Sequence, residues 1–123
     1  MALKTERELL ELSAKACGIK NFRYHPEDQF LSSSIEYDDE NDCTIVWAPH
    51  LSDGDNARME AALGIDVEWY EDDVWSFGWI DKCAKTILVG EECEPYKSHN
   101  NDRQAARRLA SLRVAAAIGE ATP

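Results

Sequence analysis

Residues 74–80, Val-Trp-Ser-Phe-Gly-Trp-Ile, form a seven-residue run in which neither alternate set of side chains is charged. One set consists of the aromatic residues Trp75, Phe77 and Trp79, and the other consists of small or aliphatic residues. A strand with one face in water alternates between apolar and polar residues, so this strand is predicted to be covered on both faces. Gly78, on the second face, allows a helix to pack close to the sheet.

The segment around this run predicts an antiparallel sheet. Three apolar runs lie within residues 65–90, separated by the acidic residues 71–73 and by Asp81-Lys82. Such short spacing is typical of a meander of antiparallel strands. Residues 43–47 form a further predicted strand that ends before Pro49, and residues 30–37 are predicted to form a short edge strand.

Local signals place three helices. Thr5 and Glu8 form a capping box at the start of a helix over residues 6–17, which Gly18 ends. A second helix, over 57–63, opens with Asp53 or Asp55 as its N-cap and closes at Gly64.

The last helix is rich in alanine. It is predicted to open near Asn100 or Asn101 and to stop at Gly119. Small side chains over much of its surface allow a close approach to a sheet or to another helix. The expected fold is therefore α+β, a helix–sheet–helix sandwich around a three- to four-stranded, mainly antiparallel sheet. A chain of 123 residues has room for one such domain over 1–123, with an acidic loop insertion at about 36–42.

Three blocks of this sequence form a recognisable combination. They are the first helix with Gly18 (residues 8–18), the segment from Trp47 to Met59 that contains Asp53-Gly54-Asp55, and the closing arginine- and alanine-rich helix at 101–119. Together these blocks resemble the phage ABA-sandwich family. The sequence departs from the family pattern at His50, which lengthens the step from Pro49 to Leu51, and in the acidic insertion. The resemblance implies a phage or prophage origin and a layered α/β/α arrangement, and it implies no biochemical activity.

The charge of the chain limits the partners it can bind. Its net charge is −11, which argues against direct contact with nucleic-acid phosphates or anionic membranes. Residues 100–123 are the exception, with four arginines against two acidic residues. No apolar run approaches the length of about 20 residues that spans a bilayer, and the N-terminus has no signal-peptide pattern. We expect a protein of the bacterial host cytoplasm.

No motif indicates a catalytic, metal or cofactor site. The four cysteines lie apart in the sequence and are expected to be free thiols, with Cys17 and Cys43 in the core. Asp53 and Asp55 have the chemistry of a cation site but lack the rest of a calcium-binding loop, and helix capping is the favoured interpretation. A metal-dependent hydrolase built on these two residues is the weakest functional hypothesis.

Histidines and aromatic residues also have ordinary structural explanations. His25, His50 and His99 lie in predicted loops and are expected to be solvated, although a Ser/His/Asp relay assembled in space stays open. A stacking platform for bases needs a basic groove, whereas the aromatic run at 74–80 has acidic flanks. Core packing is the favoured interpretation for these aromatic side chains.

Two sets of charged residues are candidate binding sites. Arginines of the last helix suit a phosphate or carboxylate ligand, and the alternative is pairing with the protein's own acidic loops. Acidic loops suit a basic partner, or imitate a nucleic-acid backbone, and the alternative is that they only keep the protein soluble. The candidates are Arg103, Arg107, Arg108, Asp38, Asp39, Glu40, Asp72 and Asp73.

The leading functional hypothesis is a non-catalytic phage accessory protein that binds a host or phage macromolecule, one form of which is an acidic inhibitor or nucleic-acid mimic. The alternative is a protein that binds or sequesters a small molecule or nucleotide with the arginines of its last helix. Pairing of that helix with a second copy is a further possibility that the sequence leaves open.

Overall fold

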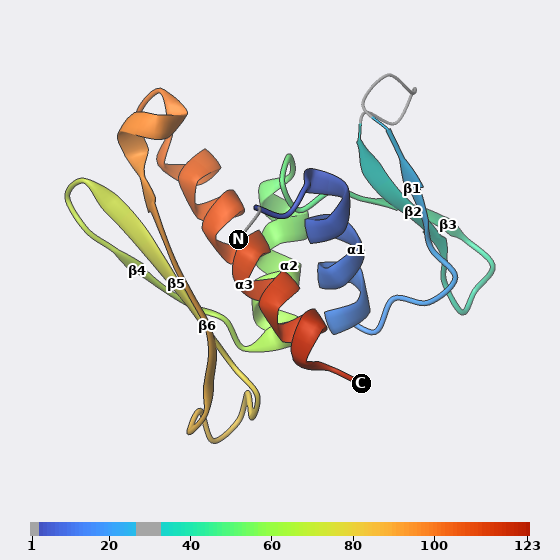
Figure 1. Cartoon of the computed structure of the whole chain (residues 1–123). Helices are drawn as coiled ribbons and strands as arrows, with labels where there is room; N and C mark the ends of the chain where they lie inside the picture. Colours follow the sequence, from blue (N-terminus) through green and yellow to red (C-terminus); the bar gives the residue numbers. More distant parts are fainter. Residues whose placement is uncertain (1–2, 27–32) are drawn as a thin grey trace.

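The computed structural model describes residues 3–26 and 33–123 (Figure 1). Its helical elements are α1 (Glu6–Ala16), α2 (Asp53–Leu63), the 3-10 helix η1 (Tyr96–His99) and α3 (Arg103–Ala121). Its strands are β1 (Arg23–His25), β2 (Ser34–Asp38), β3 (Thr44–Trp47), β4 (Asp66–Trp69), β5 (Asp73–Trp79) and β6 (Leu88–Pro95).

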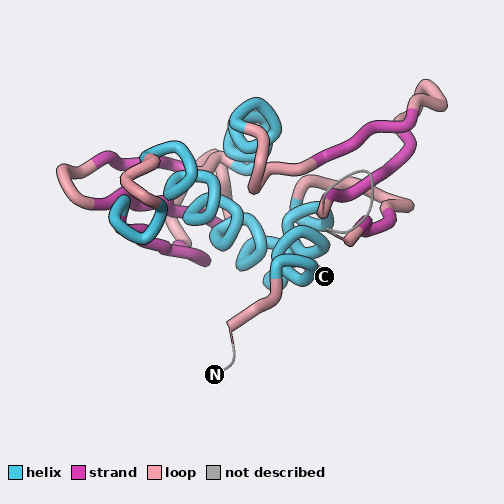
Figure 2. The backbone as a smooth tube through the Cα atoms, turned by 90° about the horizontal axis from the view of Figure 1, so that it is seen from above, coloured by secondary structure: helices cyan, strands magenta, loops and turns pink. Residues whose placement is uncertain are grey.

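The strands form two antiparallel sheets of three strands each. Sheet A has the order β1-β2-β3 and sheet B has the order β4-β5-β6. The helices lie between the two sheets when the molecule is viewed from the side and from above (Figures 1 and 2). The predicted α+β class, with helices packed on antiparallel three-stranded sheet, is confirmed. Sheet B contains the meander predicted for residues 65–90, but its third strand, β6, extends beyond this segment to Pro95.

The first two helices begin and end close to the predicted positions. The Thr5 hydroxyl accepts a hydrogen bond from the Glu8 amide and Glu8 reaches back to the Thr5 amide, as the capping box predicts. The N-cap of α2 is Ser52 rather than Asp53 or Asp55, because Ser52 Oγ accepts the bond from the Asp55 amide. Gly64 ends α2 in the left-handed conformation that glycine adopts without steric cost.

The last helix is longer than predicted. Asp102 is its N-cap, and the helix continues through Gly119 to Ala121. Gly119 does not end the helix; it lies where α3 crosses α1, and a Cβ at this position would be 2.0 Å from the carbonyl oxygen of Leu12. Helix packing therefore requires a glycine at this position. In the sequence, such a glycine looks the same as one that ends a helix.

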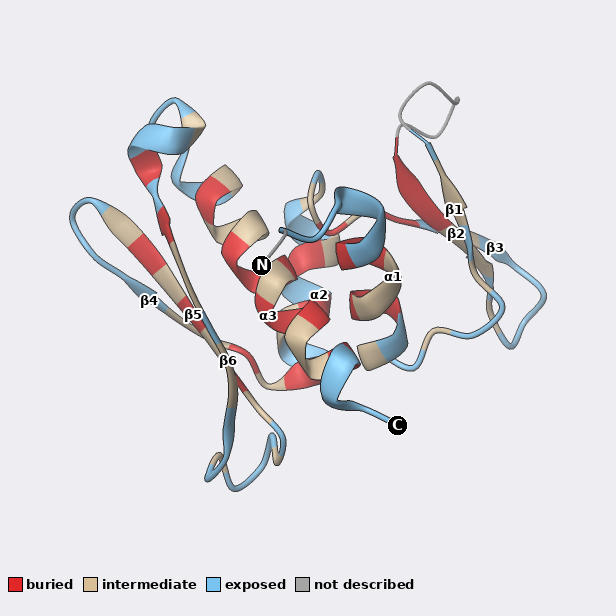
Figure 3. Ribbon diagram, viewed as in Figure 1, coloured by how far each residue is buried: buried red, intermediate tan, exposed pale blue. Residues whose placement is uncertain are grey.

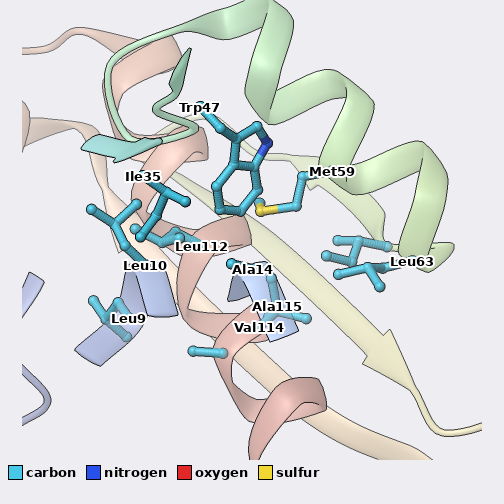
Figure 4. Close-up of a cluster of buried hydrophobic side chains, with 12 residues drawn as sticks. Leu9, Leu10, Ala14, Ile35, Trp47, Met59, Leu63, Leu112, Val114 and Ala115 are labelled. Atoms are coloured by element: carbon cyan, nitrogen blue, oxygen red, sulfur yellow. The ribbon is translucent and has the colours of Figure 1, made fainter. Parts of the chain in front are cut away.

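The core lies where α1, α2 and α3 meet sheet A (Figure 4). Trp47 of β3 points toward Met59 of α2, and Ile35 of β2 lies beside Leu10 of α1 (Figure 4). Leu10, Ile35 and Met59 are at most 1% exposed. Burial of side chains of this size stabilises the fold by about 1.5–3 kcal/mol each, so this cluster holds sheet A against the helices.

Sheet B packs on α3 through the small residues of β5. A Cβ at Gly78 would lie 2.4 Å from Val114 Cγ1, and Ser76 Oγ is 2.9 Å from Ser111 Oγ. The close approach predicted for Gly78 is thus confirmed, and α3 is the helix that makes it. Val74 and Ser76, which share this face, are fully buried.

The opposite face of β5 is less covered than expected. Burial alternates along the strand, so that Trp75, Phe77 and Trp79 are half-buried whereas their neighbours are buried (Figure 3). The expectation that helices shield residues 74–80 on both faces is met on one face only. The physical reason is that α1 packs on α3 and not on the second face of sheet B. The small side chains of α3 let this helix pack closely against sheet B on one side and against α1 on another.

The two cysteines predicted to lie in the core differ in burial. Cys43 is exposed in the turn before β3, so its prediction as a core residue is wrong, whereas Cys17 is half-buried. The predicted strand at 30–37 corresponds to β2 from Ser34 onward, and residues 30–32 lie outside the described residues. In the described part of the chain, no helix has both the length and the apolar character needed to cross a membrane.

Candidate functional site

Two of the predicted binding arginines are engaged within the protein. Arg108 Nη1 lies 2.7 Å from Asp53 Oδ1, and its Nε donates to the carbonyl oxygen of His50. Arg107 lies 3.5 Å from Asp53 and 3.6 Å from Glu60. Both side chains are less than a fifth exposed. These pairs tie α3 to α2 and match the alternative in which the arginines pair with acidic groups of the same chain.

Arg103 has a different position. Its guanidinium lies over the ring of Tyr96, 4.7 Å from the centroid, where the ring face attracts a cation. Arg103 and Asp72 line the same surface groove, with Tyr96, Lys97 and Asn101. The structure therefore brings Arg103 together with one of the predicted acidic residues and separates it from Arg107 and Arg108.

The predicted acidic residues lie at two opposite ends of the molecule. Asp38, Asp39 and Glu40 are at the β2–β3 connection, whereas Asp72 and Asp73 are at the β4–β5 connection (Figure 1). Asp39 Oδ1 accepts hydrogen bonds from two backbone amides of its own turn, so this carboxylate shapes the turn. The two clusters do not form one continuous acidic surface.

The prediction that the three histidines are solvated loop residues is wrong, because all three side chains are largely buried. His25 lies in β1 and its Nε2 is 3.4 Å from Glu36, and His99 Nε2 is 2.8 Å from Glu94. The side chains of both histidines are 18% exposed. Each histidine lies beside a carboxylate, and His99 is within hydrogen-bond distance of its partner.

Ser33, His50 and Glu6 form a polar cluster where α1 meets the start of β2. Ser33 Oγ donates to a Glu6 carboxylate oxygen and lies 3.1 Å from His50 Nε2, which is itself 3.6 Å from Glu6. In a nucleophilic relay the carboxylate binds the other ring nitrogen, Nδ1, and orients the histidine. Here the serine and the carboxylate meet the same nitrogen, so the geometry is that of a structural contact.

A second polar cluster lies between α2, α3 and sheet B. Ser111 Oγ donates to Glu60 Oε2 at 2.6 Å and is also in contact with Ser76 Oγ. Burial raises the pKa of Glu60 above its usual value of 4.5, while the Ser111 hydrogen bond and the nearby Arg107 act in the opposite direction. Both serines are fully buried, so this cluster joins the elements and offers no access to a substrate.

The two aspartates considered for a cation site have structural partners. Asp55 Oδ2 accepts a hydrogen bond from the Ala48 amide at 2.9 Å, and Asp53 pairs with Arg108. Within residues 3–26 and 33–123, no group of three or more histidine, cysteine or acidic side chains is arranged to hold a metal ion.

The face of sheet B that points away from α3 carries aromatic side chains that no helix of the described chain covers. We call it the aromatic face and define it by Trp75, Phe77 and Trp79 of β5 with their cross-strand neighbours. Trp75 and Phe77 stack with their ring centroids 6.2 Å apart and an interplanar angle of 13°. Leu88, opposite Trp79 on β6, is 45% exposed and extends the apolar surface.

Carboxylates flank the aromatic row on both neighbouring strands. Directly opposite residues of a sheet share a face, so the pairing register identifies them. Glu68 of β4 lies opposite Trp75, and Phe77 lies between Asp66 of β4 and Glu91 of β6. Asp66 pairs with Lys85 at 2.7 Å and accepts a hydrogen bond from the Trp79 indole. Glu68 and Glu91 are exposed, and Glu68 Oε2 accepts a hydrogen bond from the Tyr70 hydroxyl at 2.7 Å.

From the sequence, the aromatic residues are a candidate site only as a stacking platform for bases, with core packing as the favoured interpretation, and the carboxylates opposite them are not singled out. The aromatic row was assigned to the core because both faces of the strand are uncharged. Which face a helix covers is a tertiary property that the strand alone does not encode. No family model matches this chain, and no curated protein or solved structure is similar enough to count as a match.

Proposed function

We propose that this protein is a non-catalytic binding protein and that its partner is a protein with a basic segment. The observation that carries the proposal is the aromatic face of sheet B, where three half-buried aromatic side chains lie between strands that carry carboxylates. Protein interfaces are typically enriched in aromatic residues at their centre and have a polar rim.

The chemistry of the aromatic face favours cationic side chains. An arginine or lysine gains energy over the face of a tryptophan or phenylalanine ring and also from a nearby carboxylate. Glu68 and Glu91 are positioned for the second contact because each lies directly opposite an aromatic residue. The net charge of −11 adds a long-range attraction for a basic partner and repels a nucleic acid.

A basic partner also fits the hypothesis of nucleic-acid mimicry. A protein that binds phosphates presents arginine and lysine side chains, and these suit carboxylates as well. On this proposal the carboxylates of the aromatic face take the place of phosphates, while the rings supply apolar contact area that a phosphate backbone lacks. The host or phage partner is then a nucleic-acid-binding protein.

Peptide display on the full chain tests the proposal. Random peptides selected on the wild-type protein at low salt are expected to be enriched in arginine or lysine together with apolar residues. Binding should weaken at high salt, because exposed charges are screened. The exchange Glu91→Gln should weaken binding without affecting the fold, and Trp75→Ala should weaken it further.

Val46→Ala is the matched control for these exchanges. Val46 is a 43% exposed residue of β3 in sheet A, away from the aromatic face, so its truncation should leave peptide binding unchanged. Enrichment of neutral or acidic peptides would contradict the proposal. Equal loss of binding in the Val46 variant would contradict it as well.

The second candidate function is binding of a small anionic molecule in the groove beside Arg103. The observation that favours it is the placement of Arg103, Lys97 and the Tyr96 ring along one groove. A thermal-shift series with nucleotides tests it, with Arg103→Ala as the variant that should abolish any shift. Absence of a shift with every nucleotide in the wild-type protein would remove this candidate.

A further inference from the structure

We propose that the basic segment of the partner binds as an added strand along the outer edge of β6. This inference rests on the proposed function, and it specifies the conformation and register of the bound segment. Addition of a strand to an exposed sheet edge is a common mode of peptide recognition, in which main-chain hydrogen bonds supply affinity and alternate side chains supply specificity.

The outer edge of β6 is open in the described structure. Sheet B has the order β4-β5-β6, so β6 pairs with β5 on one side and, among residues 3–26 and 33–123, has no strand on its other side. The helix α3 packs on the inner face of the sheet, through contacts such as Gly90 with Val114 and Ala117. β6 is the longest strand described, at eight residues, and long edge strands with free backbone groups readily accept another chain.

The hydrogen-bond register shows which backbone groups point to that edge. The Tyr96 amide donates to the Asp72 carbonyl, so these two residues form a hydrogen-bonded pair. Hydrogen-bonded and non-hydrogen-bonded pairs alternate along an antiparallel ladder. Glu94 and Glu92, two and four residues before Tyr96, are therefore also hydrogen-bonded to β5. Glu91 and Cys93, at the non-bonded positions, direct their N–H and C=O groups away from β5. The pairing of β5 with β4 is consistent with this register. The Tyr70 amide donates to the Asp73 carbonyl, so the odd-numbered residues of β5 form their backbone hydrogen bonds with β4 and the even-numbered residues form theirs with β6.

The same two residues belong to the aromatic face. Cys93 lies opposite Trp75 and Glu91 lies opposite Phe77, so both side chains share the face of the rings. An added strand bonded to Glu91 and Cys93 would place every second side chain beside them on this face. Pro95 at one end and the register shift near Gly78 at the other limit the regular ladder to about residues 90–94.

Charge selects the occupant of this edge. Glu94 pairs with Arg113 at 2.6 Å and lies 2.8 Å from His99, whereas in the described part of the chain Glu91 and Glu92 form no ion pair, and Glu91 is exposed. A second copy of β6 would place its own glutamates against these, and like charges on adjacent strands destabilise a sheet. A segment with arginine or lysine at alternate positions pairs with Glu91 on the aromatic face and reaches toward the rings.

Two synthetic peptides of equal composition test the inference on the full chain. One alternates arginine with valine, and the other has the same residues in two blocks. The alternating peptide is expected to bind about tenfold more tightly, because only it places all its cations on one face of a strand. Methylation of the peptide amides that face β6 should reduce its affinity by about tenfold, whereas methylation of the outward amides should not.

Amide hydrogen exchange locates the contact. With the alternating peptide bound, the amides of Glu91 and Cys93 should become protected, while those of Glu92 and Glu94 are already protected in the free protein. The variant Cys93→Pro removes an outward donor without removing a bond to β5, and proline is tolerated at such edge positions. It should lose binding of the alternating peptide while thermal unfolding confirms that it folds.

The possible failures are distinguishable. Binding that depends on Trp75 but leaves the Glu91 and Cys93 amides unprotected would overturn strand addition and leave the proposed function intact. Failure of both basic peptides to bind at low salt would overturn the proposed function as well. Protection of the two amides by self-association, seen as a dimer in sedimentation, would assign the edge to a second copy and overturn the inference.

Discussion

Gly119 of α3 lies against the carbonyl oxygen of Leu12 in α1, so that a Cβ at Gly119 would be only 2.0 Å from this oxygen. The two helices therefore meet backbone to backbone. Gly119→Ala must push the helices apart, and we expect it to lower the free energy of unfolding by about 2 kcal/mol, as overpacking of a core typically does. Urea denaturation measures this loss.

Gly54→Ala is the matched control for this exchange. Gly54 is also helical, but the nearest atoms to its Cβ would be 3.4 Å or more away, an ordinary contact distance. Alanine favours a helix over glycine by up to about 1 kcal/mol, so this variant should be as stable as the wild type or more stable. Equal destabilisation of both variants would contradict the proposed role of close packing.

Gly78 and Val114 form the corresponding contact between β5 and α3. A Cβ at Gly78 would be 2.4 Å from Val114 Cγ1, so Gly78→Ala should destabilise the protein by about 1–3 kcal/mol. Truncation in Val114→Ala makes room for the added methyl group. The double variant should therefore lose less stability than the sum of the two single variants, and a double-mutant cycle measures the difference. Strict additivity would show that the two groups do not compete for space.

Glu60 should make stability depend on pH in a defined direction. Burial raises its pKa above 4.5, so the folded chain holds this proton more tightly than the unfolded chain does. The resulting contribution to stability is fully present below about pH 4.5 and is lost as pH rises through the folded pKa. Glu60→Gln does not titrate, so the advantage of the wild type over this variant should shrink between about pH 4 and pH 7. Urea unfolding of both proteins across this range tests the sign, and an advantage that grows with pH would contradict it.

The four thiols should differ in reactivity. Burial raises the pKa of Cys17 to about 11, which leaves about 0.1% thiolate at pH 8. Burial and the neighbouring Asp73 also raise the pKa of Cys93. Cys43 and Cys83 are exposed. Alkylation of the native protein followed by peptide mass spectrometry should modify Cys43 and Cys83 first, and all four thiols should react alike in urea. Early labelling of Cys17 would show that its site opens readily.

The parts of the fold that the sequence predicted are those specified by neighbouring residues. Thr5 and Glu8 define the start of α1 within one turn, and Gly64 ends α2 because the chain needs a left-handed residue there. The meander of sheet B followed from short acidic connections between apolar runs. In each case the interacting groups are a few residues apart, so a local pattern contains the whole interaction.

The parts that the sequence did not predict depend on contacts between distant segments. Gly119 resembles a helix end in sequence, but its small size serves a helix crossing more than a hundred residues from Leu12 along the chain. β1 has only three residues and no apolar alternation, and its pairing with β2 includes the contact of Arg23 with Glu36. The candidate site was missed for a related reason, since local hydrophobicity does not tell which face of β5 receives a helix.

The position of α3 between the two sheets also has a consequence for synthesis of the protein. Sheet B is encoded before α3, yet Gly78 packs against Val114 and Ile118 of that helix and Ser76 Oγ lies 2.9 Å from its Ser111 Oγ. During translation the meander therefore emerges before the helix that covers its inner face, and this face stays in water until residues 103–121 have left the ribosome. The nascent chain is most exposed to chaperones and to aggregation in this interval.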